Sequence, residues 1–167
     1  LVSGVDELKQ LRVVCDEVRA ELGAERTAHD GAAALGVMIE TPSAALTADH
    51  LARRCDFLSV GTNDLIQYTF AADRENGDVA HLHQPLHPAV LRMIDQTCKG
   101  ATRHQRWVGV CGGLASDLVA VPVLVGLGVT ELSATAATVP EVKALVRTLD
   151  VEACRALARQ ALDQASP

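Results

Sequence analysis

Aromatic residues are scarce in this sequence, which holds two Phe, one Trp and one Tyr among its 167 residues. A core with so few rings has to be built from Val, Leu, Ile and Ala, a composition that suits helices packed on a sheet of aliphatic strands. Long apolar runs are absent as well. None approaches the roughly 20 residues that a membrane-spanning helix needs, so we expect no membrane insertion.

Basic residues are outnumbered, with 15 Lys and Arg against 21 Asp and Glu and a net charge of -6. No Lys/Arg cluster builds a basic face along the sequence, so we do not expect nucleic acid as a partner. Five cysteines are spread along the chain without a C-x-x-C pair, at Cys15, Cys55, Cys98, Cys111 and Cys154. An odd, widely spaced set is typical of free thiols in a reducing cytoplasm.

The first residues do not resemble a signal peptide, because Asp6, Glu7 and Lys9 interrupt any apolar run. The chain opens on Leu1 rather than Met, and we expect it to be a processed or excised piece of a longer protein.

Four short apolar runs, each ending in polar residues, predict β-strands at 35–40, 57–64, 107–112 and 131–135. Their near-continuous apolar character indicates strands buried on both faces, as in a parallel sheet. Helical spacing and capping residues predict helices between and around them, at 3–23, 43–54, 88–101, 117–127, from 140 onward, and 150–164.

This alternation predicts an α/β fold made of βα units with right-handed crossovers. Length bears on the architecture, because a complete (β/α)8 barrel needs about 250 residues whereas an open doubly wound sheet fits in fewer. In either architecture the chemistry is expected at the carboxyl ends of the strands.

Two acidic residues end neighbouring predicted strands, Glu40 before Thr41-Pro42 and Asp64 after an apolar run. Two carboxylates on adjacent strand ends suit a hard cation such as Mg²⁺, which takes one or two protein carboxylates and fills its shell with phosphate and water. The alternative is that each carboxylate caps a helix or lies solvated in a loop.

Four further residues near these strand ends suit an anionic substrate. Thr62 and Asn63 offer hydrogen-bond donors after Gly61, and Arg74 offers the bidentate fork that anions need. Cys111 precedes two glycines at a strand end, where an exposed thiol serves as an acid or nucleophile. The alternatives are a solvated loop arginine paired with a neighbouring acid, and a buried cysteine that only packs.

The segment 56–74, DFLSVGTNDLIQYTFAADR, closely resembles the signature of the phosphoenolpyruvate (PEP)-utilising enzymes. The segments 36–42, GVMIETP, and 110–117, VCGGLASD, are similar to that family's other motifs, in the same order and at fitting spacings. Stretches at 67–76 and 83–88 look more like the Enzyme I group of the bacterial sugar phosphotransferase system than like the dikinases.

The resemblance implies a (β/α)8 TIM barrel that binds PEP and Mg²⁺ at its C-terminal face. The chain, 1–167, is then one unit holding about the last four βα units of the barrel domain. Residue by residue, the resemblance places the metal ligands at Glu40 and Asp64, the phosphate contacts at Asn63 and Arg74, and the cysteine that exchanges a proton with C3 of the enolate at Cys111. Gly113 stands where the family usually has Glu.

The resemblance also implies a function, PEP-protein phosphotransfer to a histidine in a domain that this chain lacks, with a histidine-containing carrier protein as the next partner and a homodimer as the assembly. We expect this chain to bind PEP weakly and to transfer no phosphoryl group by itself. Two alternatives stay open. One is a Mg²⁺-dependent lyase that holds an enolate on a related barrel, and the other is a non-catalytic dimerisation module.

Overall fold

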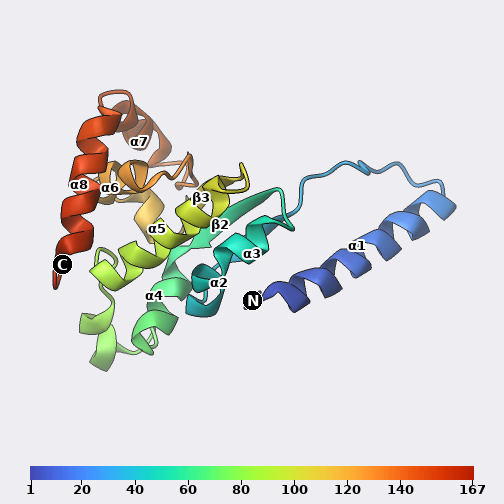
Figure 1. The fold of residues 1–167 in the computed structure, drawn as a ribbon, viewed down its shortest axis with the longest axis horizontal. Coiled ribbons are helices and arrows are strands. Elements are labelled where there is room, and N and C mark those ends of the chain that lie inside the picture. Colours follow the sequence, from blue (N-terminus) through green and yellow to red (C-terminus); the bar gives the residue numbers. More distant parts are fainter.

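The computed structural model describes residues 1–167 and has a sheet of four parallel strands, which lies near the centre of the molecule (Figure 1). They are β1 (Gly36–Ile39), β2 (Phe57–Gly61), β3 (Trp107–Cys111) and β4 (Glu131–Leu132). Their order in the sheet is β1-β2-β3-β4, the same as their order in the sequence. The four predicted strands are therefore confirmed with shorter bounds, and the last, expected over 131–135, has only two residues.

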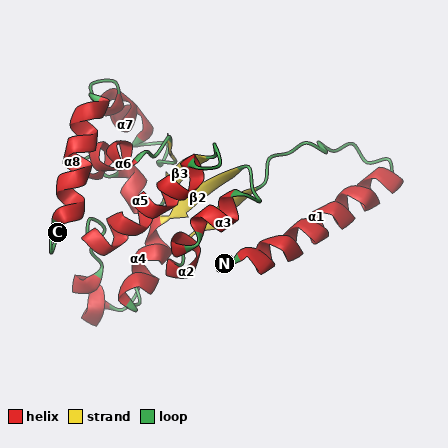
Figure 2. Cartoon of the chain, in the orientation of Figure 1, coloured by secondary structure: helices red, strands yellow, loops and turns green.

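Sequential strand order decides the architecture. Right-handed crossovers that all step in the same direction place their helices on one face of the sheet, as in a (β/α) barrel, whereas a doubly wound sheet reverses direction and is covered on both faces. The side chains on one face are buried, among them Ile39, Leu58 and Val110. In Figure 2 helix α5 crosses beside β2 and β3, which it contacts.

The prediction that the strands are buried on both faces is wrong. On the second face Met38 is 39% exposed and Trp107 is 40% exposed. The Trp107 ring stacks on the ring of Phe57, its partner in the strand register, with 4.3 Å between centroids. The strands lack the strict alternation of a one-sided sheet because this face also carries apolar residues, although no layer of this chain covers it.

The predicted helices follow one another in the expected order, and a further helix at 62–70 was not predicted. Their bounds are α1 (Val5–Ala24), α2 (Pro42–Leu46), α3 (Ala48–Ala52), α4 (Thr62–Phe70), α5 (Pro88–Thr102), α6 (Ala120–Leu127), α7 (Val139–Val146) and α8 (Val151–Asp163), with short 3-10 turns η1 (Gly77–Leu82) and η2 (Gly113–Ser116). None of these helices is both long and apolar enough to pass through a bilayer.

Capping chemistry confirms several predicted helix starts. The Asp150 carboxylate accepts a hydrogen bond from the Ala153 N–H at 2.8 Å, which satisfies one free amide in the first turn of α8. Pro88 and Pro140 both lie in the first turn of their helices, where a missing N–H costs nothing. His87 precedes α5, and its Nδ1 accepts from the Ala89 N–H at 3.1 Å.

Three predicted boundaries are wrong. The single helix expected at 43–54 is two short helices, because Thr41 caps α2 and the backbone leaves the helical conformation at Thr47. The strand expected to continue to residue 64 ends at Gly61, and α4 starts at the next residue. The helix expected from 117 begins at Ala120, after η2.

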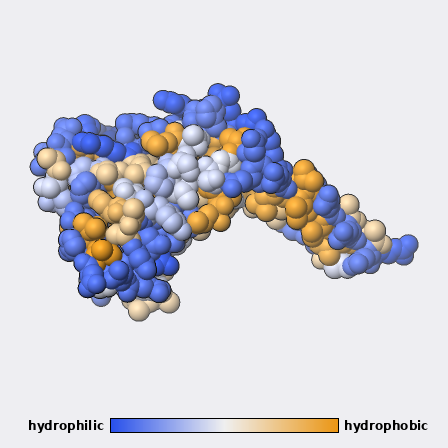
Figure 3. All heavy atoms as spheres, turned by 90° about the horizontal axis from the view of Figure 1, so that it is seen from below, coloured by the Kyte–Doolittle hydropathy of each residue, from blue (hydrophilic) through white to orange (hydrophobic).

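Helix α1 extends away from the sheet, with only its first turns near α3 (Figure 1). Leu8 is fully buried and the Arg12 Nε–H donates to the Arg54 carbonyl at 2.7 Å, but Leu11 is 40% and Val18 is 45% exposed. Figure 3 shows apolar side chains gathered along the arm formed by α1. The predicted helix is confirmed, while most of its apolar stripe has no partner within this chain.

Close packing of α6 on α8 depends on Gly126. A Cβ at this position would overlap the carbonyl oxygen of Cys154 and lie 2.9 Å from the Cβ of Ala158. We expect Gly126→Ala to lower the free energy of unfolding by about 1–3 kcal/mol, measured by urea denaturation. Gly23→Ala is the matched control, because nothing lies within 4 Å of a Cβ there. Equal losses for the two variants would contradict this account.

Candidate functional site

A small open hollow of about 230 Å³ lies at the carboxyl ends of β1, β2 and β3. It is lined by the end of β1 with the residue that follows it, by the β2–α4 junction and by the end of β3: Met38, Glu40, Gly61, Thr62, Asn63, Asp64, Cys111 and Gly112. Four of the five residues predicted from the sequence as site residues therefore line one hollow. The fifth, Arg74, does not.

The two carboxylates influence one another across this hollow. Burial raises the pKa of Glu40 above its usual range, and the negative charge of Asp64 raises it further. Asp64 lies in the first turn of α4 rather than at the strand end, because the helix starts at Thr62. A Cβ on Gly61 would be 3.0 Å from Glu40 Oε2, so glycine there leaves the carboxylate its room.

This donor set fits a hard divalent cation. Mg²⁺ takes one or two carboxylates from protein, and its remaining ligands are water and substrate oxygens. No group of three or more His, Cys, Asp or Glu side chains is placed to hold a metal by itself. The carboxylate pair therefore suits an ion that shares its coordination with a substrate.

The upward shift of the Glu40 pKa predicts how the free energy of unfolding depends on pH, which stability measurements test. The folded chain keeps a proton on Glu40 at pH values where the unfolded chain, with an ordinary pKa of 4.5, has released it. The free energy of unfolding therefore falls as the pH rises from 4.5 through the raised pKa. We expect Glu40→Gln, without added metal, to be more stable than the parent at pH 7, by about 0.5 kcal/mol, and equal to it at pH 4. Urea denaturation at the two pH values measures this, and a destabilised variant at pH 7 would contradict it.

Arg74 does not line this hollow, but it forms an ion pair with Asp64, which does. Its Nη1 lies 3.4 Å from Asp64 Oδ1, with both side chains partly exposed. Arg74 lines a neighbouring hollow of about 450 Å³ together with Asn63, Ala80 and His83. Asn63 belongs to both hollows, so a ligand that spans them passes this residue.

Cys111 is half-buried, and its thiol faces the hollow. Its Sγ lies 3.5 Å from the carbonyl oxygen of Val60, 3.6 Å from Met38 Sδ and 3.9 Å from Ser59 Oγ. Other cysteines differ. Burial raises the pKa of Cys55 to about 11 and the pKa of Cys98 to about 12, so both stay protonated and inert at neutral pH.

Comparison with protein families decides the relationship. The model of the PEP-utilising enzyme, PEP-binding domain matches residues 1–151. The chain belongs to this family. Its four parallel strands are a partial unit of the TIM-barrel type that this PEP-binding domain adopts, in agreement with the sequential strand order.

Curated relatives of this family member share its sequence over nearly its whole length. It is 51% identical to the multiphosphoryl transfer protein of Xanthomonas campestris over 97% of this chain and 19% of that protein. It is 41% and 42% identical to the PEP-protein phosphotransferases of Mycoplasma capricolum and Haemophilus influenzae, over 98% of this chain and 28% of each relative. The chain thus spans less than a third of the length of these relatives.

Sequence reasoning missed how the family motifs contact one another. Thr62, expected to donate to a ligand, is fully buried and donates to the carbonyl of Cys111 at 2.8 Å. The Asn63 Oδ1 accepts from the N–H of Gly113 at 3.1 Å, which leaves its amide nitrogen as the free donor. The adjacent Gly112 has φ +87, which favours glycine. From the sequence, Gly112-Gly113 indicates a turn, but it does not indicate that Thr62 and Asn63 contact this turn.

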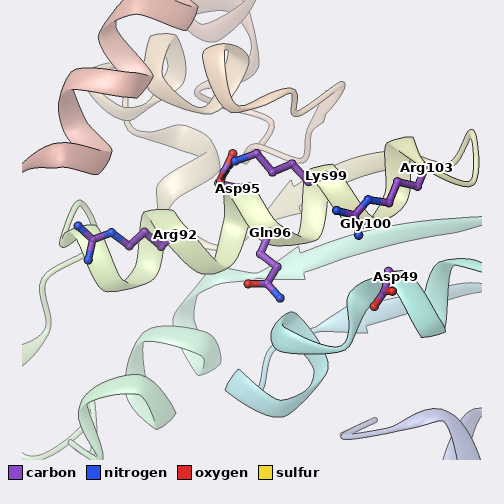
Figure 4. A pocket seen from close by; sticks show the side chains of 7 residues that line it. All are labelled: Asp49, Arg92, Asp95, Gln96, Lys99, Gly100 and Arg103. Atoms are coloured by element: carbon purple, nitrogen blue, oxygen red, sulfur yellow. Dashed lines mark hydrogen bonds and ion pairs between the residues drawn. The ribbon is translucent and has the colours of Figure 1, made fainter.

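A larger hollow, of about 390 Å³, lies between α3 and α5 on the outer, helical side of the molecule (Figure 4). It is lined by polar and charged residues. Several of these have partners within the chain, since Lys99 pairs with Asp95 and Gln96 donates to the Leu46 carbonyl at 2.9 Å. It shares no residue with the hollow at the strand ends, where the family motifs meet, so the smaller hollow is the candidate site.

Proposed function

We propose that this chain is the PEP-binding part of a PEP-protein phosphotransferase, the C-terminal part of its barrel domain, with residues 1–167 as one unit. The observation that carries the proposal is that Glu40, Asn63, Asp64 and Cys111 line one hollow, with Arg74 held against Asp64. The relatives named PEP-protein phosphotransferase support the same reaction.

In this proposal, Glu40 and Asp64 hold Mg²⁺, which when bound neutralises negative charge on the phosphate and on the leaving enolate. Arg74 and the Asn63 amide nitrogen donate hydrogen bonds to the phosphate oxygens. Because Asn63 lines both hollows, with Arg74 in one and Cys111 in the other, PEP directs its phosphate toward Arg74 and its carbon end toward Cys111. The charges in the site therefore match those of the substrate.

The reaction needs one proton from this chain, and Cys111 supplies it. A histidine nitrogen outside the chain attacks phosphorus, the bond from phosphorus to the enol oxygen breaks, and its electron pair stays on that oxygen as the enolate of pyruvate. The Cys111 S–H proton moves to C3 of the enolate and produces the methyl group of pyruvate. The thiolate then takes a proton from solvent.

The resemblance to Enzyme I extends the proposal beyond this chain. It assigns the attacking histidine to another domain, a histidine-containing carrier protein as the next acceptor, a homodimer as the assembly and the cytoplasm as the location. We further propose that this chain alone transfers no phosphoryl group, because the acceptor histidine lies outside it.

Calorimetric titration of the chain with PEP, with and without Mg²⁺, tests the proposal. We expect weak binding that requires Mg²⁺, and no phosphorylation of a carrier protein. Cleavage of an aldol substrate would favour the lyase instead. Dimers that form without ligand, together with no heat of PEP binding, would favour a pure assembly module.

A further inference from the structure

We propose that Thr62 is a positioning residue that fixes the Cys111 thiol relative to the carboxylate pair, an inference that rests on the proposed function. The structure has two buried polar side chains, Thr62 and Thr97. Thr97 bonds within its own helix, to the Met93 carbonyl four residues earlier at 2.8 Å. Thr62, in α4, instead donates at 2.8 Å to the carbonyl of Cys111, 49 residues away at the end of β3. Its buried hydroxyl therefore joins two elements rather than satisfying one helix.

A second contact from the next residue holds the same turn. Asn63 Oδ1 accepts from the Gly113 N–H at 3.1 Å, so consecutive residues of α4 bond to both sides of Gly112. A Cβ on Gly112 would lie 2.6 Å from Thr62 Oγ1 and 3.0 Å from Asn63 Oδ1. The turn after Cys111 is thus packed directly against these two side chains, with no space for displacement toward them.

This arrangement matters because Thr62, Asn63 and Asp64 are consecutive. The helical turn that carries one of the two carboxylates also holds the backbone of the thiol-bearing residue. A proton donor works only when it lies within hydrogen-bond reach of the carbon that it protonates, and a displacement of about 1 Å costs up to about 100-fold in rate. Thr62 acts on the reaction through Cys111 and not by contact with the substrate.

Alkylation of the chain by iodoacetamide, followed cysteine by cysteine with peptide mass spectrometry, tests this role without any substrate. Thr62→Val removes the hydroxyl at nearly constant volume and frees the end of β3. We expect alkylation of half-buried Cys111 to speed up by at least about threefold, since a typical hydrogen bond changes an equilibrium by about 2- to 10-fold. Thr62→Ser keeps the hydroxyl and should restore the parent rate.

The other cysteines separate positioning from general loss of structure. Cys15, on the far arm, should react at the parent rate, and the buried Cys55, Cys98 and Cys154 should stay unlabelled. Thr97→Val, the matched control, should leave Cys111 unchanged. An unchanged Cys111 alkylation rate in a folded Thr62→Val variant, or failure of Thr62→Ser to restore the parent rate, would overturn the proposal. Labelling of all cysteines would show that the variant has unfolded.

If Thr62→Val does not fold, Gly112→Ala carries the test, because its Cβ displaces the same turn. Gly112→Ala must speed up the alkylation of Cys111 and of no other cysteine. An unchanged Cys111 rate in this variant would overturn the proposal. The proposed function is tested separately, by measuring whether PEP with Mg²⁺ slows the alkylation of Cys111 in the parent chain. Absent protection together with a selective Thr62→Val effect would reject PEP binding and retain the positioning of Cys111.

Discussion

Replacing Glu40 by Gln or Asp64 by Asn is expected to remove the Mg²⁺-dependent part of PEP binding, with at least about a 100-fold loss of affinity in calorimetric titration. Each substitution replaces an anionic oxygen donor by a neutral amide in a site where two carboxylates are the only protein ligands proposed. For Glu40→Gln we expect this loss of binding together with the gain in stability of the metal-free chain. Both have one cause, because the ionised Glu40 carboxylate that binds the metal also lowers the free energy of unfolding.

Glu75→Gln is the matched control for both variants. Glu75 is an exposed acid next to Arg74, and its substitution removes one charge from the same loop region without touching the hollow. We expect its affinity for PEP to stay within about twofold of the parent, as is usual for an exposed charge. Mg²⁺-dependent binding that persists in both Glu40→Gln and Asp64→Asn would contradict the assignment of these residues.

Replacing Cys111 by Ser is expected to slow proton exchange at C3 of pyruvate by about 100- to 10,000-fold, the range for loss of a general acid–base group. The exchange is the reverse of the final proton transfer and needs no phosphoryl acceptor. It is followed as deuterium entering the methyl group of pyruvate in D₂O with Mg²⁺, by NMR.

Calorimetry separates this effect from a loss of binding. Ser is smaller and similar in shape, so Mg²⁺-dependent PEP binding should change by less than about threefold in Cys111→Ser. Cys15→Ser on the α1 arm, outside the hollow, should exchange as fast as the parent. Exchange by Cys111→Ser at the parent rate would exclude the thiol as the proton donor.

Local signals predicted much of the fold because the residues that carry them act locally. Asp150 and the prolines at 88 and 140 satisfy or remove free amides at helix starts, and this chemistry depends on a few neighbouring residues. Helix α4 was not predicted, for the opposite reason. Thr62 is fully buried and donates to a carbonyl of β3, so a tertiary contact and not a capping side chain marks the start of this helix.

Burial of the sheet was mispredicted because apolar composition does not say which face is covered. Met38 and Trp107 are apolar and lie on strands, yet that face has no covering layer in this chain. The apolar stripe of α1 shows the same limit, since Leu11 and Val18 have the spacing of a packed helix without a partner here. Periodicity identifies the element but not what lies against it.

The candidate site was predicted from residue types and family motifs, and the structure brings four of the five residues to one hollow. Arg74 was expected to pair with an acid next to it in the sequence or with a ligand. It lines an adjacent hollow, and its Nη1 lies 3.4 Å from Asp64 Oδ1. The bonds from Thr62 and Asn63 to the turn after Cys111 join segments about 50 residues apart in sequence, a pairing that spacing does not encode.

Anomalous diffraction from crystals of the chain grown with Mn²⁺ and PEP tests the central claim most directly. We expect one Mn²⁺ peak within about 2.0–2.3 Å of a carboxylate oxygen from each of Glu40 and Asp64, with the carbon end of PEP facing Cys111. A Mn²⁺ ion bound elsewhere, such as among the charged residues of α5, or PEP bound without an ion at this pair, would contradict it.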